Sequence, residues 1–105
     1  MELLKKKYLP MTETAYYILL CLTKSRHGYG IMQHVEEITN SRIKLGPGTI
    51  YGTLSKLEKD ALIIHEAEED RKKIYRLSEK GRTVLELEME RLLELLNNGK
   101  EEMEG

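Results

Sequence analysis

The sequence predicts a mainly α-helical domain with one small β-hairpin, an α+β fold. Apolar residues recur at helical spacing in four separate segments, and two short runs, 62–65 and 73–77, have the composition of strands. In addition, a leucine-rich helical stripe extends far past the second of these runs. A length of 105 residues suits a single domain with a modest core.

Charge is unevenly distributed along the chain. The whole chain has 17 Lys and Arg against 18 Asp and Glu, a net charge of −1. Residues 86–105 hold seven acidic and two basic residues, so residues 1–85 carry 15 basic against 11 acidic residues, a net charge of +4. A basic body with an acidic tail keeps nucleic acid open as a partner, although the net charge alone argues against it.

The single cysteine, Cys21, lies in an apolar run. One cysteine excludes an intramolecular disulfide and fits a reducing compartment. No apolar stretch approaches the length of about 18 residues that a membrane span needs, and we expect no cleavable signal. A cytoplasmic protein without a membrane partner is therefore expected.

Residues 1–9 form a short basic arm that is either helical or a solvated terminus. Thr12 is a suitable N-cap for a first amphipathic helix that extends to about Lys24. The segment 25–30 breaks this helix, and a second helix follows to about Asn40. The predicted buried stripe of the second helix consists of Ile31, Val35 and Ile38.

The third helix is expected from Pro47 to Lys59, with Gly46 as a permissive cap. Residues 43–45, just before it, could add a short strand. At about 100° per residue, one face of this helix carries the apolar residues Ile50, Leu54 and Leu57. The opposite face is small, hydroxylated and basic, and it includes two glycines. Because each glycine costs about 1 kcal/mol relative to alanine, the pair predicts close approach of another molecule.

The two strand-like runs after this helix form the predicted hairpin. Residues 62–65 are apolar and β-branched, and residues 73–77 alternate polar with apolar side chains. The charged segment 66–72 is its expected tip. Three helices followed by a hairpin is the layout of a winged helix-turn-helix domain, which we expect over residues 1–78.

Ser78 caps a last helix, predicted over residues 79–98 and ended by Gly99. Its apolar stripe has little of the small domain left to cover it, so the same helix of a second subunit is the simplest partner. A helix packed on the surface of a monomer is the alternative. Residues 99–105 are expected to be a disordered acidic tail. The predicted dimerisation residues are Leu85, Met89, Leu92, Leu93 and Leu96.

Three motifs give the chain a family resemblance. They are His27-Gly28-Tyr29-Gly30-Ile31, the run from Leu45 to Leu54, and the run from Tyr75 to Gly81. Together they resemble the PadR-like transcriptional regulators in their short form, over residues 9–96. The resemblance implies a homodimeric winged-helix repressor whose C-terminal helices mediate dimerisation and whose operator binding is often relieved by a small molecule.

The third helix is therefore predicted to enter the major groove of double-stranded DNA. Lysines of this helix and the basic hairpin tip are expected to contact the DNA backbone, and Tyr29 to hold a phosphate. Two such helices about 34 Å apart read an inverted repeat. The predicted DNA-binding residues are Tyr29, Pro47, Gly48, Thr49, Tyr51, Gly52, Ser55, Lys56, Lys59, Arg71, Lys72 and Lys73.

Simpler interpretations of these residues stay open. Tyr51 also fits a core aromatic on the shoulder of the apolar stripe, and Tyr29 also fits a packing role. Lys56 and Lys59 also fit a solvated helix face. The basic tip fits a generic charged loop, because three acidic residues, 68–70, precede it.

A small hydrophobic or aromatic effector is expected between the C-terminal helices, where it would shift the spacing of the two DNA-binding domains. The candidate residues are apolar or aromatic and lie near the arm or on the last helix. For all of them, packing in a subunit interface is the alternative. They are Tyr8, Leu9, Met11, Met89, Leu92, Leu93 and Leu96.

Other functional classes have less support in the sequence. An enzyme is not expected, because no nucleophile and base stand at a recognisable spacing and no phosphate-cradling loop is present; no cofactor is predicted. A metal-responsive regulator needs converging ligands, and the chain has one Cys and three His. Of these, His27 and His34 fit capping and surface exposure better than a metal site. A winged-helix protein-interaction module is the other alternative.

Overall fold

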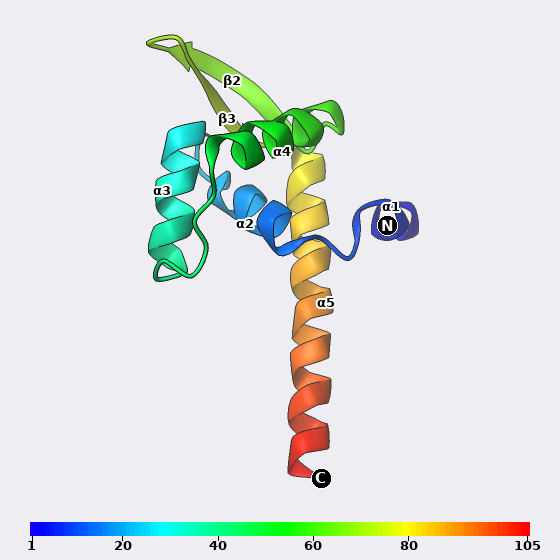
Figure 1. Ribbon diagram of the computed structural model, residues 1–105. Helices are drawn as coiled ribbons and strands as arrows, with labels where there is room; N and C mark the ends of the chain where they lie inside the picture. The colour runs from blue at the N-terminus through cyan, green and yellow to red at the C-terminus, as the bar shows by residue number, and fades with distance from the viewer.

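The computed structural model describes residues 1–105 and has five helices and one three-stranded antiparallel sheet (Figure 1). This is the mainly helical α+β fold that the sequence predicted. In chain order the elements are α1 (Glu2–Tyr8), α2 (Glu13–Cys21), β1 (Arg26–His27), α3 (Gly28–Ile38), α4 (Pro47–Lys59), β2 (Ile63–Glu69), β3 (Lys72–Leu77) and α5 (Glu79–Glu104).

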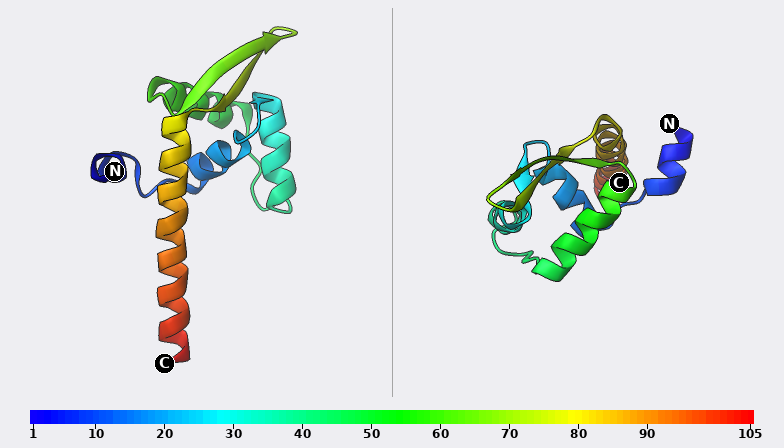
Figure 2. Two further views of the ribbon diagram at one scale, coloured as in Figure 1. Left: turned by 180° about the vertical axis from the view of Figure 1, so that it is seen from behind. Right: turned by 90° about the horizontal axis from the view of Figure 1, so that it is seen from above.

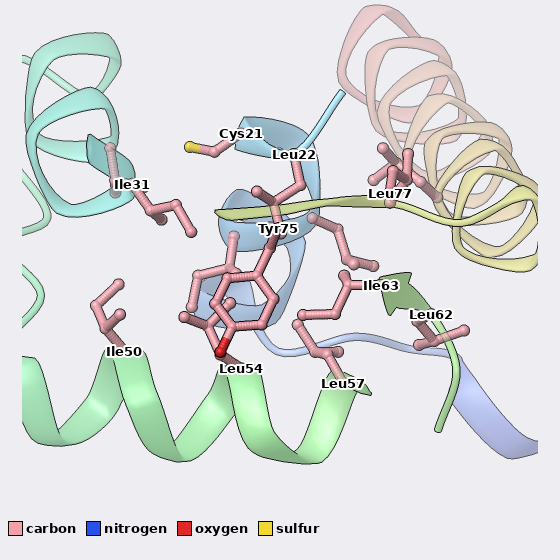
Figure 3. Packing of buried hydrophobic residues seen from close by; sticks show 14 of the residues in the cluster. Cys21, Leu22, Ile31, Ile50, Leu54, Leu57, Leu62, Ile63, Tyr75 and Leu77 are labelled. Atoms are coloured by element: carbon pink, nitrogen blue, oxygen red, sulfur yellow. The ribbon is translucent and has the colours of Figure 1, made fainter. Parts of the chain in front are cut away.

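The apolar stripes of α2, α3 and α4 meet in one core, which the sheet and the start of α5 complete (Figure 3). The predicted stripe of α4 is buried, because Ile50, Leu54 and Leu57 are 0, 1 and 5% exposed. Tyr75 of β3 points from the sheet towards α4. The core therefore fixes which face of α4 is turned outwards.

The first strand, β1, has no counterpart in the prediction. It pairs antiparallel with β3, with Arg26 opposite Tyr75 and His27 opposite Ile74, and the sheet order is β1-β3-β2. The prediction of a strand at residues 43–45 is wrong. The edge of β3 that such a strand could join is occupied by β1, and Ile43 and Leu45 instead pack half-buried against the core.

The hairpin of β2 and β3 is longer than predicted and projects from the domain as a wing (Figure 1). Its tip is the two-residue turn 70–71, where both residues have positive φ, the geometry of a tight hairpin turn. Glu68 stands opposite Lys73, and Glu69 opposite Lys72. These cross-strand pairs of opposite charge favour strand pairing across most of the segment expected to be a loop.

Two details of α2 and α3 differ from prediction. The first helix ends at Cys21 rather than near Lys24. Ile38 was expected in the core but is 42% exposed, because α3 ends there and the next residue turns inwards. That residue, Thr39, is buried; its hydroxyl donates to the Val35 carbonyl oxygen (2.7 Å) and accepts from the Ile43 N–H (3.1 Å).

The N-terminal arm is helical as α1, and it lies across α5 from the rest of the domain (Figure 2). Its connection to α2 is held by a buried carboxylate that the sequence did not single out. Glu88 is 1% exposed and accepts from the Met11 N–H (2.8 Å) and from the Arg91 guanidinium. Burial raises the pKa of Glu88, but the bonds from Arg91 and Met11 and the charge of Arg91 outweigh it and lower the pKa overall.

The last helix continues to Glu104, so its predicted end before Gly99 and the disordered tail are both wrong. A glycine ends a helix when it takes a positive φ, and no glycine of this chain does. A Cβ at Gly99 would also meet nothing within 4 Å, so no packing forces a break. The C-terminal part of α5 projects from the domain as a free rod (Figure 1).

The start of α5 lies directly against the turn that follows α4. Ser78 caps α5 as predicted, since its hydroxyl accepts from the Gly81 N–H (2.9 Å) and donates to the Ala61 carbonyl oxygen (2.7 Å). The Lys80 ammonium donates to the Asp60 carbonyl oxygen (3.0 Å). These two bonds tie the start of α5 to the residues that follow α4.

Candidate nucleic-acid interface

The outer face of α4 is open around its two glycines. A Cβ added at Gly48 or Gly52 would meet nothing within 4 Å. Pro47 occupies the first turn, and Gly46 before it provides no side-chain cap. The first N–H groups of α4 are thus left without a side-chain partner, at the positive end of the helix dipole. All twelve residues predicted to bind DNA are exposed.

A hollow of about 380 Å³ lies between α4, the start of α3 and the tip of the wing. It brings together six of the predicted residues from three separate segments, Tyr29, Tyr51, Ser55, Arg71, Lys72 and Lys73. The other six, Pro47, Gly48, Thr49, Gly52, Lys56 and Lys59, lie on α4 outside it. No acidic residue lines the hollow, so its charged groups are all cationic.

Tyr51 spans the gap between α4 and α3. Its ring lies against Gly28, where an added Cβ would come within 2.8 Å of both Cε1 and the hydroxyl oxygen of Tyr51. Tyr51 is 53% exposed, so it is not a core aromatic. Tyr75 fills that role: it is 6% exposed, and burial, then the Glu58 carboxylate and Tyr51, raise its pKa. Tyr29 is also 53% exposed, which does not fit a packing role.

Three acidic residues of the wing, Glu66, Glu68 and Glu69, have cationic neighbours in the same sheet. Besides the two cross-strand pairs near the tip, Glu66 pairs with the Arg76 guanidinium (3.2 Å) and accepts a hydrogen bond from the Ser25 hydroxyl. Arg71, at the turn, has no residue paired opposite it. The acidic strand therefore does not place its carboxylates in the hollow beside α4.

The predicted effector residues are not gathered in one place. Tyr8, Leu9 and Met11 line a hollow of about 610 Å³ between the arm and α4, together with Gly52 and Lys56. The hydroxyl of Tyr8 is buried and has no hydrogen-bond partner. The candidates on α5, Met89, Leu92, Leu93 and Leu96, do not line this hollow.

The predicted dimerisation stripe divides into a buried and an exposed part. Leu85 is 3% exposed and belongs to the core of its own chain, so its assignment to an interface is wrong. Val84 and Leu85 pack on the domain because α5 begins there, at the sheet and α2. The rest of the predicted stripe, Met89, Leu92, Leu93 and Leu96, is uncovered and between 37 and 57% exposed, and the neighbouring Leu95, which is not among the predicted dimerisation residues, is 52% exposed.

No three His, Cys, Asp or Glu side chains are placed to hold a metal ion. Burial raises the pKa of the Cys21 thiol to about 11, with the Arg26 charge opposing, so the thiol stays protonated and is a poor ligand. His27 serves as the N-cap of α3, because its Nδ1 accepts from the Gly30 N–H (3.2 Å). No helix has both the length and the apolar character needed to cross a bilayer.

His27 also lines the hollow between α3, α4 and the wing, a position that the sequence pattern did not indicate. The only sign of this position in the sequence is that His27 lies between two helices, directly before the glycines of α3. By itself, this segment indicates only that one helix ends and another begins. The side chain of a capping residue at such a break faces the same side as the helix N-terminus, which here is the side of the hollow.

Comparison with known proteins agrees with this architecture. A family model described as "Transcriptional regulator PadR-like family" matches residues 18–87. The transcriptional regulator YqjI of Escherichia coli (strain K12) is 38% identical over 60 residues, which cover 57% of this chain and 29% of YqjI. The chain spans less than a third of the length of the first curated relatives that it matches, 22% and 29%.

Solved structures with the same fold include the following two. A PadR family transcription regulator from hypervirulent Clostridium difficile R20291 has a TM-score of 0.71 and 24% identity, covering 90% of this chain and 100% of its own. RosR from H. salinarum has a TM-score of 0.73 and 22% identity, covering 84% of this chain and 79% of its own. Both matches show that the helices and strands are arranged in the same way.

Proposed function

The chain belongs to the PadR-like family of transcriptional regulators, and on this premise we propose that it binds operator DNA as a homodimer with α4 in the major groove. The observation that carries the proposal is the hollow beside α4. Six exposed residues from α3, α4 and the wing tip converge there, and their charged members are all cationic. Such a convergence suits one phosphate backbone passing between helix and wing.

Sequence is read by the outer face of α4. The absence of side chains at Gly48 and Gly52 lets the helix backbone approach the groove floor, which at about 12 Å wide admits one helix. Thr49 and Ser55 then supply hydroxyls for base edges or phosphates, and Tyr51 donates to a phosphate. Lys56 and Lys59 bind phosphates of the DNA backbone, which adds affinity without selecting a sequence.

Two copies associate through the exposed stripe of α5. Its five uncovered apolar residues are followed by Met103, which is 89% exposed. A stripe of this length on a free helix matches the seam of a two-stranded helical pair. The pair places two copies of α4 on one face, where they read an inverted repeat. Residues 1–78 thus read DNA, and α5 joins the subunits.

Binding over a promoter represses transcription, and a small hydrophobic or aromatic effector relieves it. The hollow between the arm and α4 has a volume within the range of about 300–1,000 Å³ typical of small-molecule pockets. It contains Tyr8, Leu9 and Met11, and it shares Lys56 with the outer side of α4. An occupant there changes the position of a residue that holds the DNA backbone. The protein acts in the cytoplasm.

The test is retardation of a duplex taken from the region upstream of the chain's own gene, titrated from 50 to about 300 mM salt. Lys72→Ala is expected to weaken binding to all sequences and to reduce the salt slope by about 0.9 for each phosphate that is no longer neutralised. Lys100→Ala, on the far end of α5, is the matched control and should leave the slope unchanged. Failure of the wild-type chain to bind at low salt would refute the proposal.

A further inference from the structure

The side chain of His27 has one ring nitrogen engaged and one free. Nδ1 accepts the Gly30 N–H at 3.2 Å, and this bond caps α3. Nε2 has no partner within the chain. It is not among the buried unpartnered atoms, of which the Tyr8 hydroxyl is the only one, so Nε2 is open to solvent. The ring is half-buried and lines the hollow beside α4.

The cap fixes where the ring carries its proton. A backbone N–H can only donate, so Nδ1 must accept and carries no hydrogen. In the neutral ring the proton is therefore on Nε2. The backbone of His27 is itself held in β1 opposite Ile74, so the direction of the ring is set by two independent constraints. His27 is thus a prepositioned hydrogen-bond donor at the hollow.

The surroundings of this donor indicate what it meets. The Tyr51 hydroxyl reaches the adjacent residue, Gly28, and so provides a second uncharged donor nearby. Arg71, Lys72 and Lys73 line the same hollow from the wing. A hollow lined by hydrogen-bond donors and cations, with no carboxylate, suits an anionic ligand. Beside a helix that lies in the major groove, the nearest anion is a phosphate of the DNA backbone.

We propose that Nε2–H of His27 donates to a phosphate of bound DNA, as a contact from an uncharged ring at the start of α3. The inference rests on the proposed DNA binding. Because the contact is made by an uncharged ring, it releases no counterion. It therefore contributes to affinity without contributing to the salt slope, unlike the contacts of the lysines.

Two substitutions separate the roles of the two nitrogens. Ser is a good N-cap that lacks a group at the position of Nε2, so His27→Ser keeps the cap and removes the donor. Gln places an amide N–H₂ near the position of Nε2 but does not cap, so His27→Gln keeps the donor and removes the cap. DNA affinity is measured on the upstream duplex and on a random duplex at low salt, with the melting temperature of each variant.

His27→Ser is expected to melt like the wild type and to bind both duplexes about tenfold more weakly, with an unchanged salt slope. His27→Gln is expected to melt roughly 4–8 °C lower and to bind within about twofold of the wild type. The ¹⁵N shifts of the free wild-type ring should identify Nδ1 as the unprotonated nitrogen.

Wild-type affinity for His27→Ser, a reduced salt slope for it, or a proton on Nδ1 in the neutral ring would each overturn the inference while leaving the proposed DNA binding intact. Absence of binding by the wild-type chain to either duplex at low salt would instead refute the proposed function, and this inference with it. The outcomes are therefore distinguishable by the wild-type measurement alone.

Discussion

Gly81→Ala is expected to lower the melting temperature by about 15 °C, from a loss of roughly 3 kcal/mol of stability. An added Cβ would lie 2.0 Å from the carbonyl oxygen of Leu62 and 2.9 Å from its carbonyl carbon. These are backbone atoms, so no side chain can turn aside to make room. The helix must move away from the α4–β2 turn, which breaks the bonds that Ser78 and Lys80 make there.

The matched control is Gly99→Ala on the same helix. Nothing lies within 4 Å of a Cβ at Gly99, so this change should only replace a poor helix former by a good one, raising stability by up to about 1 kcal/mol. Thermal melting followed by circular dichroism measures both variants. If Gly81→Ala melts as high as the wild type, α5 does not dock on the turn after α4 as described.

If the chain dimerises through α5 as proposed, Leu92→Glu is expected to give folded monomers with weak DNA binding. Leu92 is 37% exposed in the single chain, so the substitution leaves the domain core intact. At a two-fold interface, however, each subunit would bury an unpaired carboxylate at a cost of at least about 3 kcal/mol. One subunit alone then holds only half of the operator.

Sedimentation at micromolar concentration gives the mass, and circular dichroism checks that the chain is folded. Asn98→Glu adds the same charge to the polar side of α5 and should leave the dimer unchanged. A Leu92→Glu variant that sediments as a dimer would rule out the exposed stripe as the interface, and a monomeric wild type would rule out dimerisation itself.

The helices were predictable because their apolar residues repeat over several turns. The stripe of α4 identified both its buried face and, by exclusion, its open face with Gly48 and Gly52. Element ends were less predictable. Gly99 does not stop α5, because in this context no packing or turn requires a left-handed residue there.

Features that depend on contacts distant in sequence were not predictable from local patterns. The two-residue strand β1 is too short to show alternation, and only β3 defines it. Glu88 is a charged residue of the kind usually found on the surface, yet it is buried and accepts a hydrogen bond from an N–H 77 residues away. Within the candidate site, the sequence singled out exposed residues of α3, α4 and the wing, but the place of His27 beside them depends on the hollow that three segments form together.

The central claim, that the open face of α4 is the DNA-reading surface, is tested most directly by the DNA affinity of Gly48→Glu. A side chain at this position meets nothing in the chain, and a carboxylate in the first helical turn is favourable to the helix dipole. The variant should therefore melt no lower than the wild type. Facing DNA, the same carboxylate repels the phosphates, and affinity for the upstream duplex should fall by at least about 100-fold, equivalent to roughly 3 kcal/mol. A stable Gly48→Glu variant that binds this duplex as tightly as the wild type would contradict the account.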